Sequence, residues 1–269
     1  MSERPVAIVT GASSGIGMAT AMEFAKRGYA VVLAARRVDR LEEVARRCEQ
    51  SGGTARVRPT DVSDPDQVQG LIAAAAERFG RIDVMVNNAG FGVQARVHQT
   101  EDRDMRDIFD VNFFGVFYGC KFVAPVMMRR RSGHIFNVSS VIGKRGTPFN
   151  GPYCATKFAV CGLTDALRVE MIPYNVRVTC VCPGLTETEF SSRVRGRRTE
   201  TMARVVGRRA PVGTVARKIA ATVGKNKPEL IFTPSGRALV LLSAIWPRMA
   251  DRILKVYHDA VVRDMKEER

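Results

Sequence analysis

Strand-like apolar runs alternate with helix-length amphipathic segments along most of this 269-residue chain, and this alternation limits the folds it can adopt. Nearly continuous apolar strands that alternate with helices indicate a parallel sheet with helices on both faces. We therefore expect an α/β fold with a doubly wound parallel sheet of about seven strands. The expected strands are 6–10, 30–35, 55–58, 82–87, 135–139, 177–182 and 230–232. The expected helices include 16–27, 38–50 and a third that Asp64 caps and that runs to about 79.

No linker, internal repeat or low-complexity segment interrupts this pattern, so residues 1–269 are predicted to form a single domain. The longest apolar run, 238–246, is shorter than the about 20 residues that a transmembrane helix needs. The N-terminus lacks the apolar stretch of a signal peptide. The six cysteines form no CxxC pair, so we expect reduced thiols, no metal site and a cytoplasmic protein. They are Cys48, Cys120, Cys154, Cys161, Cys180 and Cys182.

One expected helix, at 111–128, is apolar at nearly every position. A helix on the protein surface would carry a single apolar stripe. We therefore expect burial on both sides, with the sheet against one side. Either a second copy of the chain or the chain's own loops would cover the other side.

A glycine-rich loop joins the first strand to the first helix. Its sequence is Thr10-Gly11-Ala12-Ser13-Ser14-Gly15-Ile16-Gly17. Glycines let the backbone turn sharply and approach a phosphate closely, and the helix N-terminus offers N–H groups to an anion. The spacing differs from the common GxGxxG fingerprint. Its position still predicts a nucleotide cofactor bound to a Rossmann-type sheet.

Five segments together resemble the short-chain dehydrogenase/reductase family. The order and spacing match from residue 5 to about 190. The resemblance implies a single-domain, NADP-preferring oxidoreductase that interconverts a carbonyl and an alcohol. The matching segments are the glycine-rich loop, Asn87-Asn88-Ala89-Gly90, Ser140, Tyr153-Cys154-Ala155-Thr156-Lys157 and Pro183-Gly184.

The candidate catalytic residues are Asn112, Ser140, Tyr153 and Lys157. Tyr153 and Lys157 are four residues apart on an expected helix and so share a face. A nearby ammonium favours the phenolate and lowers the pKa of a tyrosine from its usual value near 10. The resemblance implies that Tyr153 transfers the proton and that Lys157 also holds the nicotinamide ribose. It further implies that Ser140 holds the substrate oxygen and that Asn112 holds a water. Ser139 competes with Ser140 but fits the strand end less well.

The residues after the second strand bear on the choice of cofactor. An NAD-selective site presents an acid about 20 residues beyond the glycine-rich loop. Ala35 stands at that position here, and Arg36 and Arg37 follow it. A guanidinium suits a 2′-phosphate, so NADP(H) is predicted over NAD(H). Many NADP-dependent relatives also carry a basic residue in the loop where this chain has Ser14. The expected cofactor-binding residues are Gly11, Ser13, Ser14, Gly15, Ile16, Gly17, Arg36, Arg37, Asp61, Val62, Asn88, Ala89, Gly90, Tyr153, Lys157, Pro183, Gly184, Leu185 and Thr188.

Residues 189–212 take the place of the family's substrate lid. Seven arginines and one acid lie between 191 and 210, within a chain of net charge +15. This segment is either a solvated surface or a landing site for an acidic handle, such as the phosphates of coenzyme A or an acyl carrier protein. No recognition motif accompanies the charge, so no nucleic-acid partner is expected. The arginines are Arg193, Arg195, Arg197, Arg198, Arg204, Arg208 and Arg209.

A C-terminal extension at 235–265 is predicted to form two helices, 235–246 and 247–262, with Pro247 at the start of the second. Its apolar residues recur at helical spacing. The extension either folds over the substrate cleft or a subunit interface, or anchors the protein weakly to a membrane surface. The recurring residues are Leu242, Trp246, Met249, Ile253 and Val256.

The predicted function is NADPH-dependent interconversion of a carbonyl and an alcohol. Apolar cleft walls at Phe91, Val93, Val141 and Phe149 favour a lipophilic substrate. Two alternatives remain: a 3-oxoacyl thioester reductase, motivated by the arginines, and a non-catalytic membrane-peripheral or regulatory NADP(H)-binding protein. A homodimer or homotetramer is expected.

Overall fold

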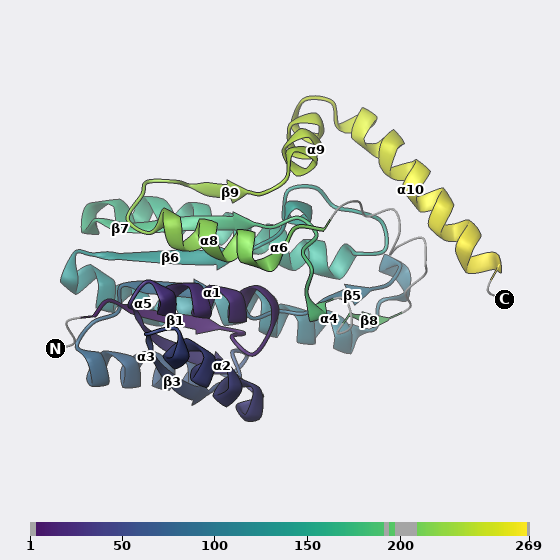
Figure 1. Ribbon diagram of the computed structural model, residues 1–269. Coiled ribbons are helices and arrows are strands. Elements are labelled where there is room, and N and C mark those ends of the chain that lie inside the picture. The colour runs from purple at the N-terminus through teal and green to yellow at the C-terminus, as the bar shows by residue number, and fades with distance from the viewer. Residues whose placement is uncertain (1–3, 191–193, 197–208, 268–269) are drawn as a thin grey trace.

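The computed structural model describes residues 4–190, 194–196 and 209–267. Its centre is a seven-stranded sheet in the order β3-β2-β1-β4-β6-β7-β9, in which every neighbouring pair is parallel (Figure 1). This confirms the expected doubly wound sheet. The strands are β1 Val6–Thr10, β2 Ala30–Ala35, β3 Thr54–Pro59, β4 Val84–Asn87, β6 Gly133–Val138, β7 Val176–Cys182 and β9 Glu229–Ile231.

Helices cover both faces of the sheet and enclose two apolar clusters. Side chains alternate between the faces along each strand. In β1, Val6 and Ile8 therefore join one cluster, whereas Ala7 and Val9 join the other. The first cluster is covered by α3 Pro65–Phe79, α5 Gly115–Arg130 and α6 Gly151–Met171, and the second by α1 Gly15–Lys26, α2 Val38–Gln50 and α8 Val212–Thr222.

The start of α3 shows how closely local sequence determines the structure. The Asp64 carboxylate accepts hydrogen bonds from the backbone N–H groups of Asp66, at 2.9 Å, and Gln67, at 3.3 Å. The Gln67 side chain reaches back as well, because its Oε1 accepts a hydrogen bond from the Asp61 N–H at 2.9 Å. The expected cap at Asp64 is confirmed, and it also holds the turn that carries Asp61.

The apolar helix expected at 111–128 is part of a longer helical stretch. It contains α4 Asp102–Phe109, a π-helical turn at Asp110–Phe114, and α5. This stretch is long and apolar enough to cross a membrane, with a mean hydropathy of 1.4. However, Val116, Val123 and Met127 lie in the core, so α5 packs as a core helix. The helical stretch is not buried all round, since Phe114 in the π-helical turn is 38% exposed.

Several short elements escaped the sequence analysis. Two of them, β5 Val93–Gln94 and β8 Arg195–Gly196, form a separate two-stranded parallel sheet. Two-residue strands carry too little alternation to be seen in a sequence. The remaining short elements are the 3₁₀ turns Val97–Gln99, Val141–Gly143 and Ile172–Tyr174.

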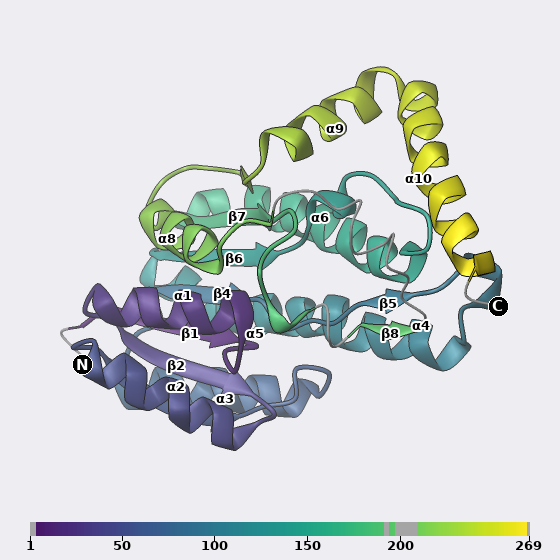
Figure 2. The same ribbon diagram turned by 45° about the vertical axis from the view of Figure 1, so that its right-hand side comes forward.

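Two C-terminal helices, α9 Pro234–Ile245 and α10 Pro247–Glu267, form an arch that stands off the sheet (Figure 2). The Phe149 ring stacks on the His258 ring of α10, with 5.4 Å between centroids. An ion pair between Arg145 and Asp251 ties the same helix to the body. Several large apolar side chains of this extension are exposed, among them Trp246 at 61%.

His134 links β6, β7 and the chain before β9 through its neutral ring. Its Nε2 lies 2.8 Å from the Thr179 hydroxyl oxygen, and that hydroxyl donates to the Lys227 carbonyl. Its Nδ1 accepts a hydrogen bond from the Gly224 N–H at 3.2 Å. Nε2 is therefore the protonated nitrogen. Burial lowers the pKa of His134 to about 3, with the Arg177 charge as a smaller cause.

Because of this lowered pKa, the free energy of unfolding depends on pH. Below pH 6.5 the unfolded chain binds a proton at His134 that the folded chain does not bind, so stability falls as pH falls from 6.5 towards 3. Between pH 7 and pH 5 we expect this residue to remove about 2 kcal/mol from the free energy of unfolding. Urea unfolding at both pH values should show that loss in the wild type and in His98→Asn, whose histidine is exposed. The His134→Gln variant should lose less unfolding free energy between pH 7 and pH 5. A loss equal to that of the wild type would show that His134 does not cause the pH dependence.

Candidate active site

A cavity of about 870 Å³ opens at the carboxyl ends of the central strands. Ligands of doubly wound sheets bind at this edge, where the strand order reverses. The glycine-rich loop lines one end of the cavity, and side chains of α9 and α10 line the other. Of the expected cofactor-binding residues, all except Gly17 line this one cavity.

The glycine-rich loop is shaped by backbone conformations and contacts that exclude side chains. Gly11 and Gly15 have φ angles of +65° and +56°, which favour glycine. A Cβ on Gly17 would lie 2.2 Å from the Gly11 carbonyl oxygen. Gly17 therefore supports the loop from behind. Because no acidic residue stands in the first turn of α1, nothing there repels an anion at this helix end.

A threonine and an asparagine brace the loop against β4. The Asn88 side-chain amide donates to the Thr10 carbonyl at 3.0 Å. The backbone N–H groups of Asn88 and Ala89 donate to the Thr10 hydroxyl at 2.9 and 3.1 Å. These contacts explain why Thr10 and Asn88 must accompany the glycines.

Two arginines line the cavity near the glycine-rich loop. The Arg36 side chain is 71% exposed and lies 3.8 Å from an Asp61 carboxylate oxygen. Arg37 donates from Nη2 to the Ser13 hydroxyl at 3.0 Å. This contact ties the end of β2 to the glycine-rich loop, and the sequence analysis did not predict it. The glycine cradle and two guanidinium groups beside it fit a phosphorylated dinucleotide.

Tyr153 and Lys157 reach the cavity from α6, and Ser140 reaches it from the turn after β6. The Lys157 ammonium lies 5.6 Å from the centre of the Tyr153 ring. It donates a hydrogen bond to the Val138 carbonyl at 2.8 Å. The Ser139 hydroxyl is buried and donates to the Lys157 carbonyl at 2.8 Å. Both serines line the cavity, but the Ser140 hydroxyl makes longer contacts, with the Pro183 carbonyl at 3.5 Å and the Ile142 N–H at 3.4 Å. Ser140 therefore stays the candidate for contact with a substrate.

Asn112 occupies the π-helical turn and is fully buried. Its Oδ1 accepts from the Phe91 N–H, and its Nδ2 donates to the Phe91 carbonyl, both at 2.9 Å. The same amide donates to the Thr156 hydroxyl at 3.3 Å. The side chain does not line the cavity. In this arrangement it positions the chain after β4 against α6. The expectation that Asn112 also holds a water stays a prediction.

The pKa values of the catalytic pair depart from the sequence expectation. Removing the Tyr153 hydroxyl from water raises its pKa, and the hydrogen bond with Ser140 opposes that rise. Burial lowers the pKa of Lys157 to about 8, although the sulfurs of Cys161, Cys180 and Cys182 raise it. The expected lowering of the tyrosine pKa is therefore wrong for the protein alone. The physical reason is the burial of the phenol, which raises its pKa by more than the hydrogen bond with Ser140 lowers it.

The cavity walls also need a correction. Phe91 and Val141 line the cavity as expected, but Val93 and Phe149 are buried elsewhere. Val93 belongs to β5, and Phe149 supports α10. Alternate residues of a loop point in directions that a sequence does not reveal. Other apolar side chains complete the wall. Ile253 belongs to the extension that was expected either over the cleft or elsewhere, and the analysis missed Phe190, Val194, Leu239, Leu254 and Tyr257.

Two lid arginines fall within the described part of the chain. Arg195 binds Asp104 and Asp107 at 2.9 and 2.7 Å, and its guanidinium lies 4.8 Å from the centre of the Phe91 ring. It fastens β8 to α4. Arg209 lines the cavity. The other lid arginines, at 193, 197, 198, 204 and 208, lie outside the described residues.

Comparison with known proteins places this geometry among oxidoreductases. Residues 5–199 match the family described as short chain dehydrogenase. The chain is 35% identical to the 3-oxoacyl-[acyl-carrier-protein] reductase FabG of Thermotoga maritima over 74% of its length and 81% of that protein.

Two solved structures share the fold. A short-chain dehydrogenase/reductase of Burkholderia phymatum in complex with NAD has a TM-score of 0.83 and 28% identity, covering 90% of this chain and 93% of that one. A tryptophan variant of the actinorhodin polyketide ketoreductase with NADPH has a TM-score of 0.77 and 32% identity, covering 86% of this chain and 97% of that one.

Proposed function

The chain belongs to the short-chain dehydrogenase family, whose members act as oxidoreductases on alcohol and carbonyl groups, and from that premise we propose that it reduces a lipophilic ketone or aldehyde with NADPH. The reverse oxidation uses the same groups. The observation that best supports the proposal is one cavity with two chemically different ends. Arg36 and Arg37 stand at one end, and apolar side chains line the other, with Tyr153 and Ser140 in the wall.

The mechanism assigns the proton to Tyr153. When bound, the nicotinamide supplies a hydride to the carbonyl carbon or accepts one from the alcohol. Tyr153 donates its phenolic proton to the substrate oxygen in reduction and takes it back in oxidation. A raised pKa keeps the phenol protonated, which suits a proton donor. General acid catalysis of this kind contributes about 10²–10⁴ to the rate.

Ser140 and Lys157 both support that transfer. The Ser140 hydroxyl hydrogen-bonds Tyr153 and stands where it can donate to the same substrate oxygen. Such a donor stabilises the negative charge that develops on the oxygen. The Lys157 ammonium behind the ring stabilises the phenolate that remains after the proton has left.

The preference for a lipophilic substrate rests on the far end of the cavity. Phe190 packs against the Tyr153 ring, with 5.5 Å between centroids. Leu239 of α9 and Leu254 and Tyr257 of α10 extend the wall. Closing such a wall around an apolar molecule removes apolar surface from water, which stabilises the complex by about 25 cal/mol per Å².

A thioester remains the second candidate. Arg209 lines the cavity, and the relative from Thermotoga maritima is a 3-oxoacyl-[acyl-carrier-protein] reductase. In that case the arginines would hold the phosphates of the carrier, and salt would weaken the attraction.

The two candidates predict different rates of NADPH consumption. We expect free lipophilic ketones and aldehydes to be reduced faster than 3-oxoacyl-CoA thioesters, with little change between low and high salt. Arg209→Ala should leave those rates within about twofold, because an uncharged carbonyl gives the guanidinium no ionic partner. A preference for thioesters that salt and Arg209→Ala both reduce would replace our proposal with the second candidate. If NADPH is consumed with neither the free carbonyls nor the thioesters, a non-catalytic NADP(H)-binding protein would be favoured.

The cofactor preference is tested by reversing the charge at Arg36. A hydrogen bond between charged partners contributes about 1.5–3 kcal/mol, which corresponds to about 10- to 100-fold. We therefore expect Arg36→Asp to shift the ratio of kcat/KM values for NADPH and NADH towards NADH by at least about tenfold. Arg40→Asp makes the same charge change on α2, where Arg40 pairs with Glu43 outside the cavity, and should leave the ratio unchanged. Equal ratios in the two variants would remove Arg36 from the cofactor site.

A further inference from the structure

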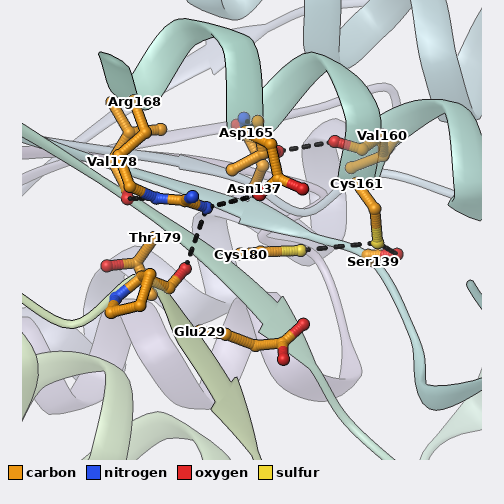
Figure 3. Close-up of polar contacts among 12 residues, drawn as sticks. Asn137, Ser139, Val160, Cys161, Asp165, Arg168, Val178, Thr179, Cys180 and Glu229 are labelled. Atoms are coloured by element: carbon orange, nitrogen blue, oxygen red, sulfur yellow. Dashed lines mark hydrogen bonds and ion pairs between the residues drawn. The ribbon is translucent and has the colours of Figure 1, made fainter. Parts of the chain in front are cut away.

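Three buried cysteines, Cys161, Cys180 and Cys182, meet where α6 packs on β7. Figure 3 shows two of them, Cys161 and Cys180. The sulfur of Cys161 lies 3.6 Å from that of Cys180, which lies 3.6 Å from that of Cys182. All three sulfurs lie within 4.8 Å of one another. In the described part of the chain, no other three groups that commonly bind metals come as close together.

The fold explains how the three thiols come together. Cys180 and Cys182 are two residues apart on β7, so their side chains point to the same face of the sheet. Cys161 comes from α6, one helical turn after Lys157. The sequence shows only a Cys-x-Cys pair and a distant cysteine, which is why the search for CxxC motifs excluded a metal.

The spacing suits a metal ion bound by thiolates. Zinc–sulfur bonds are about 2.3 Å long, and a tetrahedral arrangement then separates neighbouring sulfurs by about 3.8 Å. The two 3.6 Å separations are close to this value. A disulfide would require one pair to approach to about 2.05 Å. The cluster is therefore nearer to the geometry of a metal site than to that of a cystine.

A fourth ligand, an oxygen, stands beside the thiols. The Cys182 thiol donates to Oε1 of Glu229, on the edge strand β9, at 3.4 Å. Lys144 Nζ lies 2.8 Å from the same oxygen. The Lys144 and Glu229 side chains are 23% and 28% exposed, so this pair separates the buried thiols from water.

We propose that Cys161, Cys180, Cys182 and Glu229 bind one zinc ion, or another thiophilic d¹⁰ cation, and thereby clamp α6 to β7 and β9. Binding converts up to three thiols into thiolates and releases their protons, and it requires no change of oxidation state. The Ser139 hydroxyl lies 3.2 Å from the Cys161 sulfur and also bonds the Lys157 carbonyl. The clamp would therefore stabilise the helix turn that carries Tyr153 and Lys157. This site is separate from the proposed reduction and does not depend on it.

The test uses the full-length, reduced protein after treatment with a chelator. Zinc alone is titrated in competition with a chromophoric indicator, and cadmium alone is followed by its thiolate charge-transfer absorbance in the ultraviolet. We expect one equivalent of either ion per chain. At a free zinc concentration of about 100 times Kd, the midpoint of thermal unfolding should rise by about 5–10 °C.

Matched variants identify the ligands. Cys161→Ala and Cys182→Ala should lose the stoichiometric absorbance, whereas Cys48→Ala, which removes a buried thiol of α2, should keep it. Glu229→Gln retains all three sulfurs, so it should keep the cadmium absorbance but bind zinc about 10- to 100-fold more weakly. Circular dichroism of each variant checks that the chain is folded. The proposal is overturned if the wild type gives no such absorbance, or if the folded Cys161→Ala and Cys182→Ala variants retain it.

Discussion

Two reciprocal hydrogen bonds between α6 and the end of β6 hold the functional groups in place. The Lys157 ammonium donates to the Val138 carbonyl, and the Ser139 hydroxyl donates to the Lys157 carbonyl. These bonds fix the rotation of α6 and its height above the sheet. Tyr153 lies one turn before Lys157, and Ser140 follows Ser139. The contact that anchors the lysine therefore also places the phenol and the hydroxyl on the same cavity wall.

A buried polar network continues this anchoring across the sheet. The Asn87 amide donates to Asn137 Oδ1 at 2.9 Å, and the Asn137 amide donates to the Thr164 hydroxyl at 3.0 Å. The network joins β4, β6 and α6 directly below the site. Apart from Asn87 Oδ1, the side-chain polar atoms of this network have hydrogen-bond partners. Because an unpaired buried polar group is costly, few other positions of α6 along the sheet would keep these bonds. The proposed zinc site would act on the same helix, because Cys161 lies between Lys157 and Thr164 in α6.

Local sequence predicted the scaffold well but indicated less about side-chain direction. The strands β1 and β2, the helix α2 and the cap at Asp64 follow from apolar alternation and capping chemistry, which act over a few residues. The placement of Phe149 against α10 depends on a helix about 100 residues later in the chain. The Asn112 bonds to Phe91 and the grouping of Cys161 with Cys180 likewise depend on tertiary packing, as does the engagement of Lys157 by Val138. For these residues the sequence shows the residue type and its spacing from other motifs, but it does not show which residue each side chain contacts.

The account depends most directly on Tyr153 as the proton donor. The measurement is a single-turnover reduction of a lipophilic ketone by the NADPH-loaded enzyme, comparing wild type with Tyr153→Phe, with the NADPH dissociation constant of each measured in parallel. We predict that the variant binds NADPH within about threefold of wild type but transfers hydride about 10²–10⁴ times more slowly. An unchanged rate in a folded variant that binds NADPH normally would show that another group supplies the proton, and the proposed mechanism would be wrong.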